Sequence, residues 1–163
     1  MKIALAGNPN CGKTTMFNAF TGKTEKVGNW SGVTVEKKIA KLKKKYNTSD
    51  EEVYVVDLPG TYGIKTYTND EMEAVQFIKN NEINCLINIV DALNLERSLN
   101  FTLELKELGI PMIVALNKFD RVEKKNQINL ELLEDLIGCP VVPTSAYKSK
   151  GLKKLAKVAL QEG

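Results

Sequence analysis

The sequence contains no histidine, only three cysteines and one tryptophan in 163 residues. The cysteines, Cys11, Cys85 and Cys139, are widely spaced and form no C-x-x-C pair, so neither a disulfide framework nor a zinc site is indicated. Without histidine or clustered cysteines, the chain has no ligand set for iron or another transition metal. The scarcity of cysteine favours a reducing cytosolic compartment.

Long apolar runs are also missing. No run approaches the about 20 residues that span a bilayer, and the start MKIALAG lacks the apolar core of a signal peptide, so we expect these residues to be soluble. The formal net charge is only +3, too small to indicate a nucleic-acid or membrane partner. One basic run is typical of a solvated edge strand whose lysines discourage edge-to-edge pairing, and no nucleic acid is expected as a partner. It consists of Lys37, Lys38, Lys41, Lys43, Lys44 and Lys45.

Short apolar runs alternate with segments of helical periodicity, which predicts an α/β fold with helices on both faces of a mostly parallel sheet. About six strands, one of them an antiparallel edge strand, and about five helices are expected in a single domain over residues 1–163. The expected strands are Lys2–Ala6, a β-rich stretch within Val33–Tyr46, Val53–Val56, Cys85–Val90, Met112–Leu116 and Val141–Pro143. The expected helices are Lys13–Phe20, Asp70–Lys79, Leu95–Leu108, Leu130–Ile137 and Leu152–Gln161.

A glycine-rich loop follows the first predicted strand. Residues 7–14, GNPNCGKT, fit the phosphate-loop pattern G-x-x-x-x-G-K-[ST] between a strand and a helix, as the pattern requires. Backbone amides and the helix N-terminus favour phosphate, Lys13 can reach the β- and γ-phosphates, and the Thr14 hydroxyl can bind Mg²⁺. The nucleotide contacts expected from this loop are Asn8, Asn10, Cys11, Gly12, Lys13, Thr14 and Thr15.

Asp57-Leu58-Pro59-Gly60 follows the strand Val53–Val56. An aspartate at such a strand end can hold Mg²⁺ through water, and the amide of Gly60 can contact a γ-phosphate. By itself D-x-x-G is a common turn sequence. Behind a phosphate loop, it predicts the magnesium side of a nucleotide site.

Asn117-Lys118-Phe119-Asp120 closes another predicted strand, and this motif favours GTP over ATP. A carboxylate can accept two hydrogen bonds side by side, and guanine presents N1–H and its 2-amino group in that arrangement, whereas adenine does not. Asp120 is therefore the expected discriminator. The stem of Lys118 can lie along the purine, and Asn117 can tie this loop to the phosphate loop. Ser145-Ala146, after the last strand, could offer a backbone amide to the guanine carbonyl.

In this order, the motifs resemble small GTP-binding domains of the translation-factor-related class over essentially the whole chain. Residues 27–36 (VGNWSGVTVE), 57–62 (DLPGTY) and 90–97 (VDALNLER) are similar to the cytosolic G domain of the FeoB ferrous-iron transport family. The resemblance implies a three-layer P-loop GTPase fold. It also implies that Thr34 joins Mg²⁺ when GTP is bound, with a first switch at about 28–35 and a second at about 60–69.

The family resemblance further implies a helical regulatory segment and a membrane permease, both absent from these residues. The full-length protein would then lie at the cytoplasmic face of the cell membrane, with this domain as its GTP-dependent switch. A homodimer or a higher oligomer is left open.

Hydrolysis is expected to be slow. Thr61 follows Gly60, where a glutamine usually orients the attacking water. The resemblance implies that Asn10 binds K⁺, which takes the place of an arginine charge, with backbone carbonyls near Asn29 and Trp30 completing that site. The expected catalytic residues are Lys13, Asn10, Thr34 and Gly60.

Two other functions stay open. The lysine run could make the domain a ribosome- or RNA-associated GTPase, and salt-sensitive RNA binding would then be observed. The missing glutamine is also compatible with a module that binds GTP or GDP without significant turnover.

Overall fold

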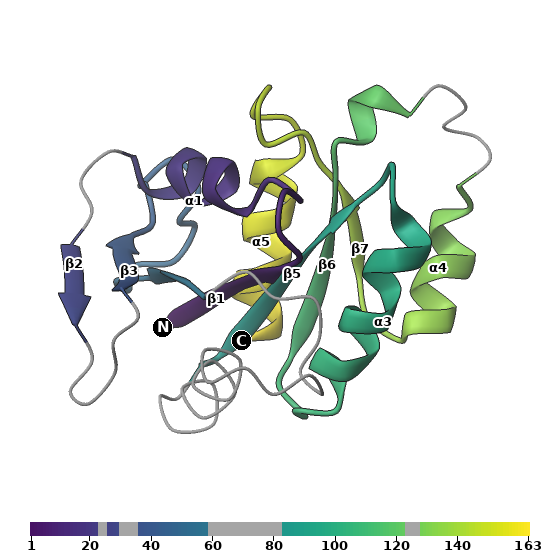
Figure 1. The fold of residues 1–163 in the computed structure, drawn as a ribbon. Helices are drawn as coiled ribbons and strands as arrows, with labels where there is room; N and C mark the ends of the chain where they lie inside the picture. The colour runs from purple at the N-terminus through teal and green to yellow at the C-terminus, as the bar shows by residue number, and fades with distance from the viewer. Residues whose placement is uncertain (23–25, 30–35, 59–82, 123–127) are drawn as a thin grey trace.

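A computed structural model of the chain describes residues 1–22, 26–29, 36–58, 83–122 and 128–163. In this part of the chain, helices cover both faces of one central sheet (Figure 1). The strands are β1 (Lys2–Gly7), β2 (Lys26–Asn29), β3 (Glu36–Lys41), β4 (Tyr54–Asp57), β5 (Cys85–Asp91), β6 (Met112–Asn117) and β7 (Val141–Pro143). The helices are α1 (Lys13–Thr21), α3 (Leu95–Lys106), α4 (Leu130–Ile137), α5 (Leu152–Glu162) and the short 3₁₀ helix η1 (Phe119–Arg121).

The strand order is β2-β3-β4-β1-β5-β6-β7. Neighbouring strands from β4 to β7 pair in parallel, whereas β3 is antiparallel to both β2 and β4. The carboxyl ends of the parallel strands therefore all lie along the same edge of the sheet. In open α/β sheets this edge is where ligands bind.

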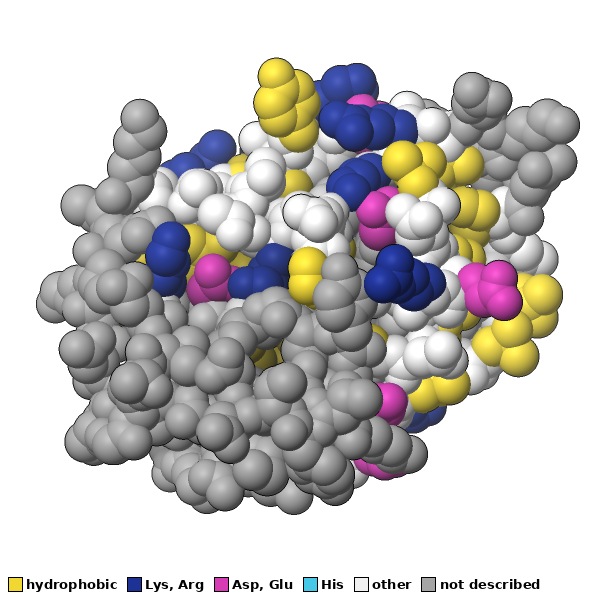
Figure 2. Space-filling model, in the orientation of Figure 1, with side chains coloured by type: hydrophobic (Ala, Val, Ile, Leu, Met, Phe, Trp, Pro, Cys, Tyr) yellow, Lys and Arg dark blue, Asp and Glu magenta, His cyan; other side chains and the backbone are white. Residues whose placement is uncertain are grey.

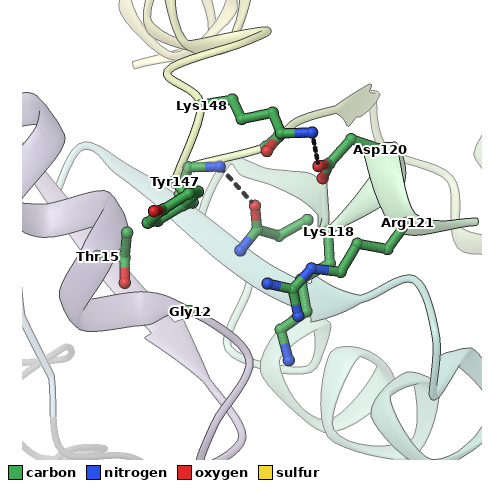
Figure 3. Close-up of a pocket in the computed structure, with 10 residues that line it drawn as sticks. Gly12, Thr15, Lys118, Asp120, Arg121, Tyr147 and Lys148 are labelled. Atoms are coloured by element: carbon green, nitrogen blue, oxygen red, sulfur yellow. Dashed lines mark hydrogen bonds and ion pairs between the residues drawn. The ribbon is translucent and has the colours of Figure 1, made fainter.

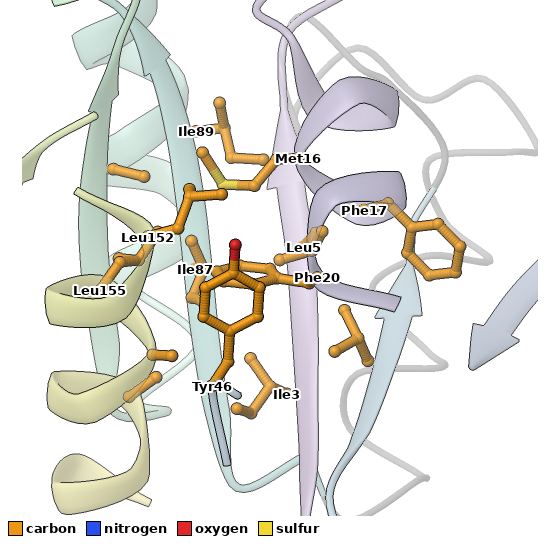
Figure 4. Close-up of a cluster of buried hydrophobic side chains, with 14 of the residues drawn as sticks. Ile3, Leu5, Met16, Phe17, Phe20, Tyr46, Ile87, Ile89, Leu152 and Leu155 are labelled. Atoms are coloured by element: carbon orange, nitrogen blue, oxygen red, sulfur yellow. The ribbon is translucent and has the colours of Figure 1, made fainter. Parts of the chain in front are cut away.

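Successive side chains of a strand point to opposite faces of the sheet, so a hydrophobic core forms on each face. On β1, Ile3 and Leu5 face one side, where they pack with α1 and α5 (Figure 4), and Ala4 and Ala6 face the other side. The second core contains residues of α3 and α4, among them Phe101. Strands buried on both faces read as continuous apolar runs, which is why they could be located in the sequence.

The structure confirms the expected fold class. Five strand predictions and the helices α1, α3, α4 and α5 agree to within two residues at each end. The sheet in the described residues has seven strands, where about six were expected, because Lys26–Asn29 adds an outer strand. This segment contains a lysine, a glycine and an asparagine and has no apolar alternation that would reveal it. The antiparallel strand β3 is therefore the second strand in the order, and β2 is the outermost one. The predicted helix Asp70–Lys79 lies outside the described residues.

Within the part of the chain that the structure describes, no helix combines the length and the apolar character needed to cross a membrane.

Candidate functional site

Polar side chains gather where the parallel strands end. β1 leads into the phosphate loop, β4 ends at Asp57, β5 ends at Asp91, β6 ends at Asn117, and β7 leads to Ser145. These five segments are far apart in the sequence. The parallel register of β4, β1, β5, β6 and β7 brings them to one edge of the sheet.

The phosphate loop needs glycine at two positions for different reasons. Gly12 has φ 98°, and a Cβ there would lie 2.3 Å from Asn117 Nδ2. A Cβ on Gly7 would lie 2.6 Å from Cys11 Sγ and 2.8 Å from the carbonyl oxygen of Ile89. Substitution at Gly7 or Gly12 would thus push the loop away from the strands that support it.

The side chain of Cys11 faces the core and is 2% exposed. Burial raises the pKa of this thiol to about 11, and the nearby charges of Lys13 and Lys118 only partly oppose the effect. The thiol therefore stays protonated at neutral pH, and the contribution of Cys11 to the loop is its backbone. Asn8 is 8% exposed, and its Oδ1 has no hydrogen-bond partner in the part of the chain that the structure describes.

Lys13, at the start of α1, forms an ion pair with Asp57, at the end of β4. Their side chains are only 12% and 11% exposed, so each charge is neutralised largely by the other. The structure thereby places the predicted phosphate-binding cation beside the predicted magnesium-binding carboxylate.

The hydroxyl of Thr14 and the carboxylate of Asp57 are hard oxygen donors of the kind that Mg²⁺ prefers, so the residues present fit this ion. Thr14 is exposed at the start of α1. Among the described residues, no three histidine, cysteine or acidic side chains gather as a metal cluster. A magnesium ion would thus have few protein ligands here and would need phosphate oxygens and water, which is its usual mode at nucleotide sites.

Asn117 joins three of the five segments and is 3% exposed. Its Nδ2 donates to the carbonyl oxygen of Cys11 at 2.9 Å, which is the predicted tie to the phosphate loop. Its Oδ1 accepts from the amide of Ala146 at 2.9 Å and from Thr144 Oγ1 at 3.3 Å. One amide side chain thus sets the spacing between the phosphate loop and the loop after β7.

The amides of Ser145 and Ala146 are both used inside the protein. Ser145 donates to the carbonyl oxygen of Lys150 at 3.1 Å, and Ala146 donates to Asn117. The predicted amide contact with a guanine carbonyl therefore requires one of these bonds to be shared or exchanged. These hydrogen bonds could not be predicted from the sequence, because the dipeptide Ser-Ala carries no information about the partners of its amides.

Lys118 is clamped between two partners. Its Nζ donates to the carbonyl oxygen of Asn10 at 2.7 Å and to Asp91 Oδ2 at 2.6 Å. Asn10 itself has φ 66°, a conformation that asparagine tolerates better than most residues. Lys118, which is predicted to lie along the purine, is thus hydrogen-bonded to the backbone of Asn10, which is predicted to bind K⁺.

No sequence motif predicts a role for Asp91. The residue is 8% exposed, and its second oxygen accepts from the amide of Leu93 at 2.9 Å, which fixes the carboxylate. Its sequence signal is an acidic residue at the end of an otherwise apolar buried strand, directly before a predicted helix. An unpaired carboxylate is rarely buried, so this pattern could have indicated a cationic partner.

Asp120 lies on η1 and pairs with Lys148, whose Nζ is 2.9 Å from Asp120 Oδ2. The pKa of Asp120 is held below its usual value by hydrogen bonds from the side chains of Lys148 and Ser145 and by the positive charge of Lys148. The carboxylate is therefore ionised at neutral pH and acts only as an acceptor, which suits a ligand that presents two donors.

A pocket of about 380 Å³ opens between these groups (Figure 3). It is lined by Gly12, Thr15, Asn117, Lys118, Asp120, Arg121, Ser145, Ala146, Tyr147 and Lys148. The pocket adjoins the phosphate loop at Gly12 and carries a carboxylate at Asp120, so it can hold a molecule with a hydrogen-bonding edge and an anionic end.

Three predicted site residues, Trp30, Thr34 and Gly60, lie outside the described residues. Asn29 ends β2. The magnesium role of Thr34, the phosphate contact of Gly60 and the potassium-binding carbonyls near Trp30 stay predictions.

The sheet order, the phosphate loop after β1 and the Asn117–Asp120 motif after β6 define a P-loop GTPase domain. A family model described as "Ferrous iron transport protein B" matches residues 1–159. The chain belongs to this family, as its resemblance to FeoB predicted.

Proteins of similar sequence support this family assignment. The Fe(2+) transporter FeoB of Escherichia coli (strain K12) is 48% identical over 160 residues, which is 95% of this chain and 20% of that protein. FeoB of Salmonella typhimurium is also 48% identical, over the same shares of the two chains. The chain thus spans about one fifth of the length of these relatives.

Solved structures show which domain of FeoB this chain resembles. The G domain of T. maritima FeoB has a TM-score of 0.85 at 35% identity, with 99% of this chain and 98% of that chain covered. An S. thermophilus NFeoB variant bound to mGDP has a TM-score of 0.89 at 41% identity, with 99% of this chain and 60% of that chain covered. The chain corresponds to the FeoB G domain.

Proposed function

We propose that this domain binds GTP and GDP, hydrolyses GTP slowly and serves as the switch of a prokaryotic ferrous-iron transporter. The observation that carries the proposal is the pocket that connects the phosphate loop at Gly12 with the carboxylate of Asp120. The relatives support it, since they include Fe(2+) transporters and a G domain variant whose structure is GDP-bound.

Each end of the nucleotide would meet a different kind of group. Asp120 would accept the guanine N1–H and 2-amino hydrogens, while the stem of Lys118 would lie along the purine. Lys13 would exchange its contact with Asp57 for the β- and γ-phosphate oxygens. Asn117 would keep the two ends at a fixed distance, because it bonds to both the phosphate loop and the loop after β7.

Magnesium would be held by Thr14, Asp57 and Thr34, and when bound it would neutralise charge on the phosphate oxygens. Lys13 would contribute positive charge at the same place. Because Thr61 follows Gly60, no glutamine is available there to orient water, and turnover without an activating partner would be slow.

The remaining parts of the proposal concern the whole protein. We propose that residues 1–163 form one G domain, that a helical regulatory segment and a membrane permease belong to the same polypeptide, and that the domain faces the cytoplasm. Nucleotide state would be passed to the permease, and self-association of the domain is one route for this. A module that binds nucleotide without turnover is the second candidate, favoured by the same Thr61.

Exchange of sodium for potassium tests the catalytic part. If Asn10 binds K⁺ beside the phosphates, GTP turnover should be about tenfold faster in potassium, which corresponds to ~1.4 kcal/mol of transition-state stabilisation. Asn10→Gly should remove the difference and keep the positive φ of this position without strain. Phosphate release in the two salts measures both effects. Equal rates for the unchanged chain would exclude a role for K⁺, and no release in either salt would favour the binding module.

A second test concerns Asp91. Asp91→Asn keeps the shape and the acceptor for Leu93 but removes the charge that holds Lys118, so GDP should dissociate about tenfold faster, as expected for a lost charged hydrogen bond. Stopped-flow release of a fluorescent GDP analogue measures this. Asp50→Asn, at an exposed loop position, is the control. Unchanged release from Asp91→Asn would show that the clamp does not contribute to nucleotide retention.

A further inference from the structure

We propose that Tyr147 is the stacking residue for the purine: its ring forms the wall against which one face of the guanine base packs. The inference rests on the proposed function and deepens it, because no motif of the chain assigns this residue a role. Tyr147 would contribute to the affinity for the base, whereas Asp120 would determine which base is bound.

The exposure of Tyr147 is the first observation. At 84% it is the most exposed large apolar side chain in the described part of the chain. In the space-filling view, apolar side chains and a group of lysine and arginine side chains lie side by side on the part of this face over the loop between β7 and α5 (Figure 2). Packing within the domain therefore does not account for this ring. It does line the pocket at Asp120.

The second observation is the arrangement of the pocket walls. Figure 3 shows Tyr147 beside Thr15, on the side of α1, and Lys118 with Arg121 on the opposite side. Asp120 lies at one end between these walls. A purine has two flat faces and one hydrogen-bonding edge. The pocket offers an aromatic ring for one face, cationic side chains for the other and a carboxylate for the edge.

The third observation is that the loop holds Tyr147 firmly. Ser145 and Lys150 exchange two backbone hydrogen bonds, of 3.1 and 3.0 Å, and the amide of Ser149 donates to the carbonyl oxygen of Ala146 at 3.2 Å. Tyr147 thus lies in a closed turn whose base is attached to Asn117 through Ala146. A ring presented by a fixed turn loses little entropy on stacking.

Stacking depends on the π-face of a base, which all purines share. Loss of the Tyr147 ring should therefore weaken binding of GDP and of inosine 5′-diphosphate by the same factor. Inosine differs from guanosine only in lacking the 2-amino group, so the ratio of the two affinities reports on Asp120 alone. This pair of ligands separates the stacking residue from the edge-reading residue.

The experiment is equilibrium binding of GDP and inosine 5′-diphosphate to the chain and its variants. Tyr147→Ala should weaken both ligands by about tenfold, within the range measured for base stacking on aromatic residues. Tyr147→Phe and Tyr147→Trp should bind both within about twofold of the unchanged chain, because the aromatic ring is retained. Leu136→Ala, which removes another apolar side chain that is 72% exposed, is the matched control and should change neither affinity.

Thermal unfolding of each variant establishes that Tyr147→Ala is folded, and Tyr147→Leu provides a second non-aromatic variant. Unchanged affinities of Tyr147→Ala would overturn the inference, and so would a loss confined to GDP. If the unchanged chain binds neither ligand, the proposed function itself fails, which is a different result from normal binding that is insensitive to Tyr147.

Discussion

Asp120→Asn is expected to weaken GDP binding by about 10³-fold and to strengthen binding of xanthosine 5′-diphosphate. The carboxylate of Asp120 only accepts, and guanine offers two donors to it. The amide of asparagine would place a donor against a donor of guanine, and both groups would be left unpaired in the complex. Xanthine carries a carbonyl in place of the 2-amino group, so it offers the asparagine amide an acceptor.

The surroundings of Asp120 make the change in specificity measurable without a large change in stability. Lys148, the partner of Asp120, is half exposed, and exposed ion pairs contribute little to folding. Because the pKa of Asp120 is lowered, the carboxylate stays ionised as the pH falls from neutral, and GDP affinity should stay constant until the pH approaches that lowered pKa.

Isothermal titration with both nucleotides measures the change in specificity. Asp135→Asn, which removes an exposed acidic charge from α4, is the control. If Asp120→Asn still prefers GDP, another group reads the guanine edge, and the assignment of Asp120 is wrong.

The sequence was sufficient for the fold because the strands of a sheet covered on both faces are apolar throughout. Cys85–Val90 and Met112–Leu116 were found for this reason, and each continues by only one residue in the structure. The outer strand β2 was missed since its sequence, KVGN, shows no alternation of apolar and polar residues. Local sequence cannot define a strand that depends on its neighbour β3 for pairing.

The site was predictable where a motif carries its own chemistry. Lys13, Asp57 and Asn117 follow from the phosphate loop, the strand end and the N-K-x-D pattern, and the structure places them at one edge. Asp91 and Tyr147 were not predicted, because their significance comes from what lies opposite. Lys118 is 27 residues from Asp91 in the chain, and only the parallel pairing of β5 with β6 makes them neighbours.

Asn117→Asp is the substitution expected to damage both folding and binding. The two side chains have the same shape, so the change replaces one donor with an acceptor. That acceptor would face the carbonyl oxygen of Cys11 at the 2.9 Å where Nδ2 now donates, at a position only 3% exposed. A buried carboxylate set against a carbonyl should cost about 3 kcal/mol of unfolding free energy. For a domain of this size, the melting temperature should fall by about 10 °C.

Nucleotide binding should fall further than the loss of stability explains. With the hydrogen bond to Cys11 gone, the phosphate loop and the loop after β7 are no longer held at a fixed distance. GDP affinity should drop about 100-fold, the size of the loss that a misplacement of about 1 Å can cause in reaction rates. Asn88→Asp is the matched control: Asn88 is 1% exposed on β5, and its Nδ2 donates to Thr102 Oγ1 at 2.6 Å, inside the core. This variant should also melt at a lower temperature but bind GDP normally while folded. Equal losses of GDP affinity in the two variants would mean that Asn117 acts through stability alone.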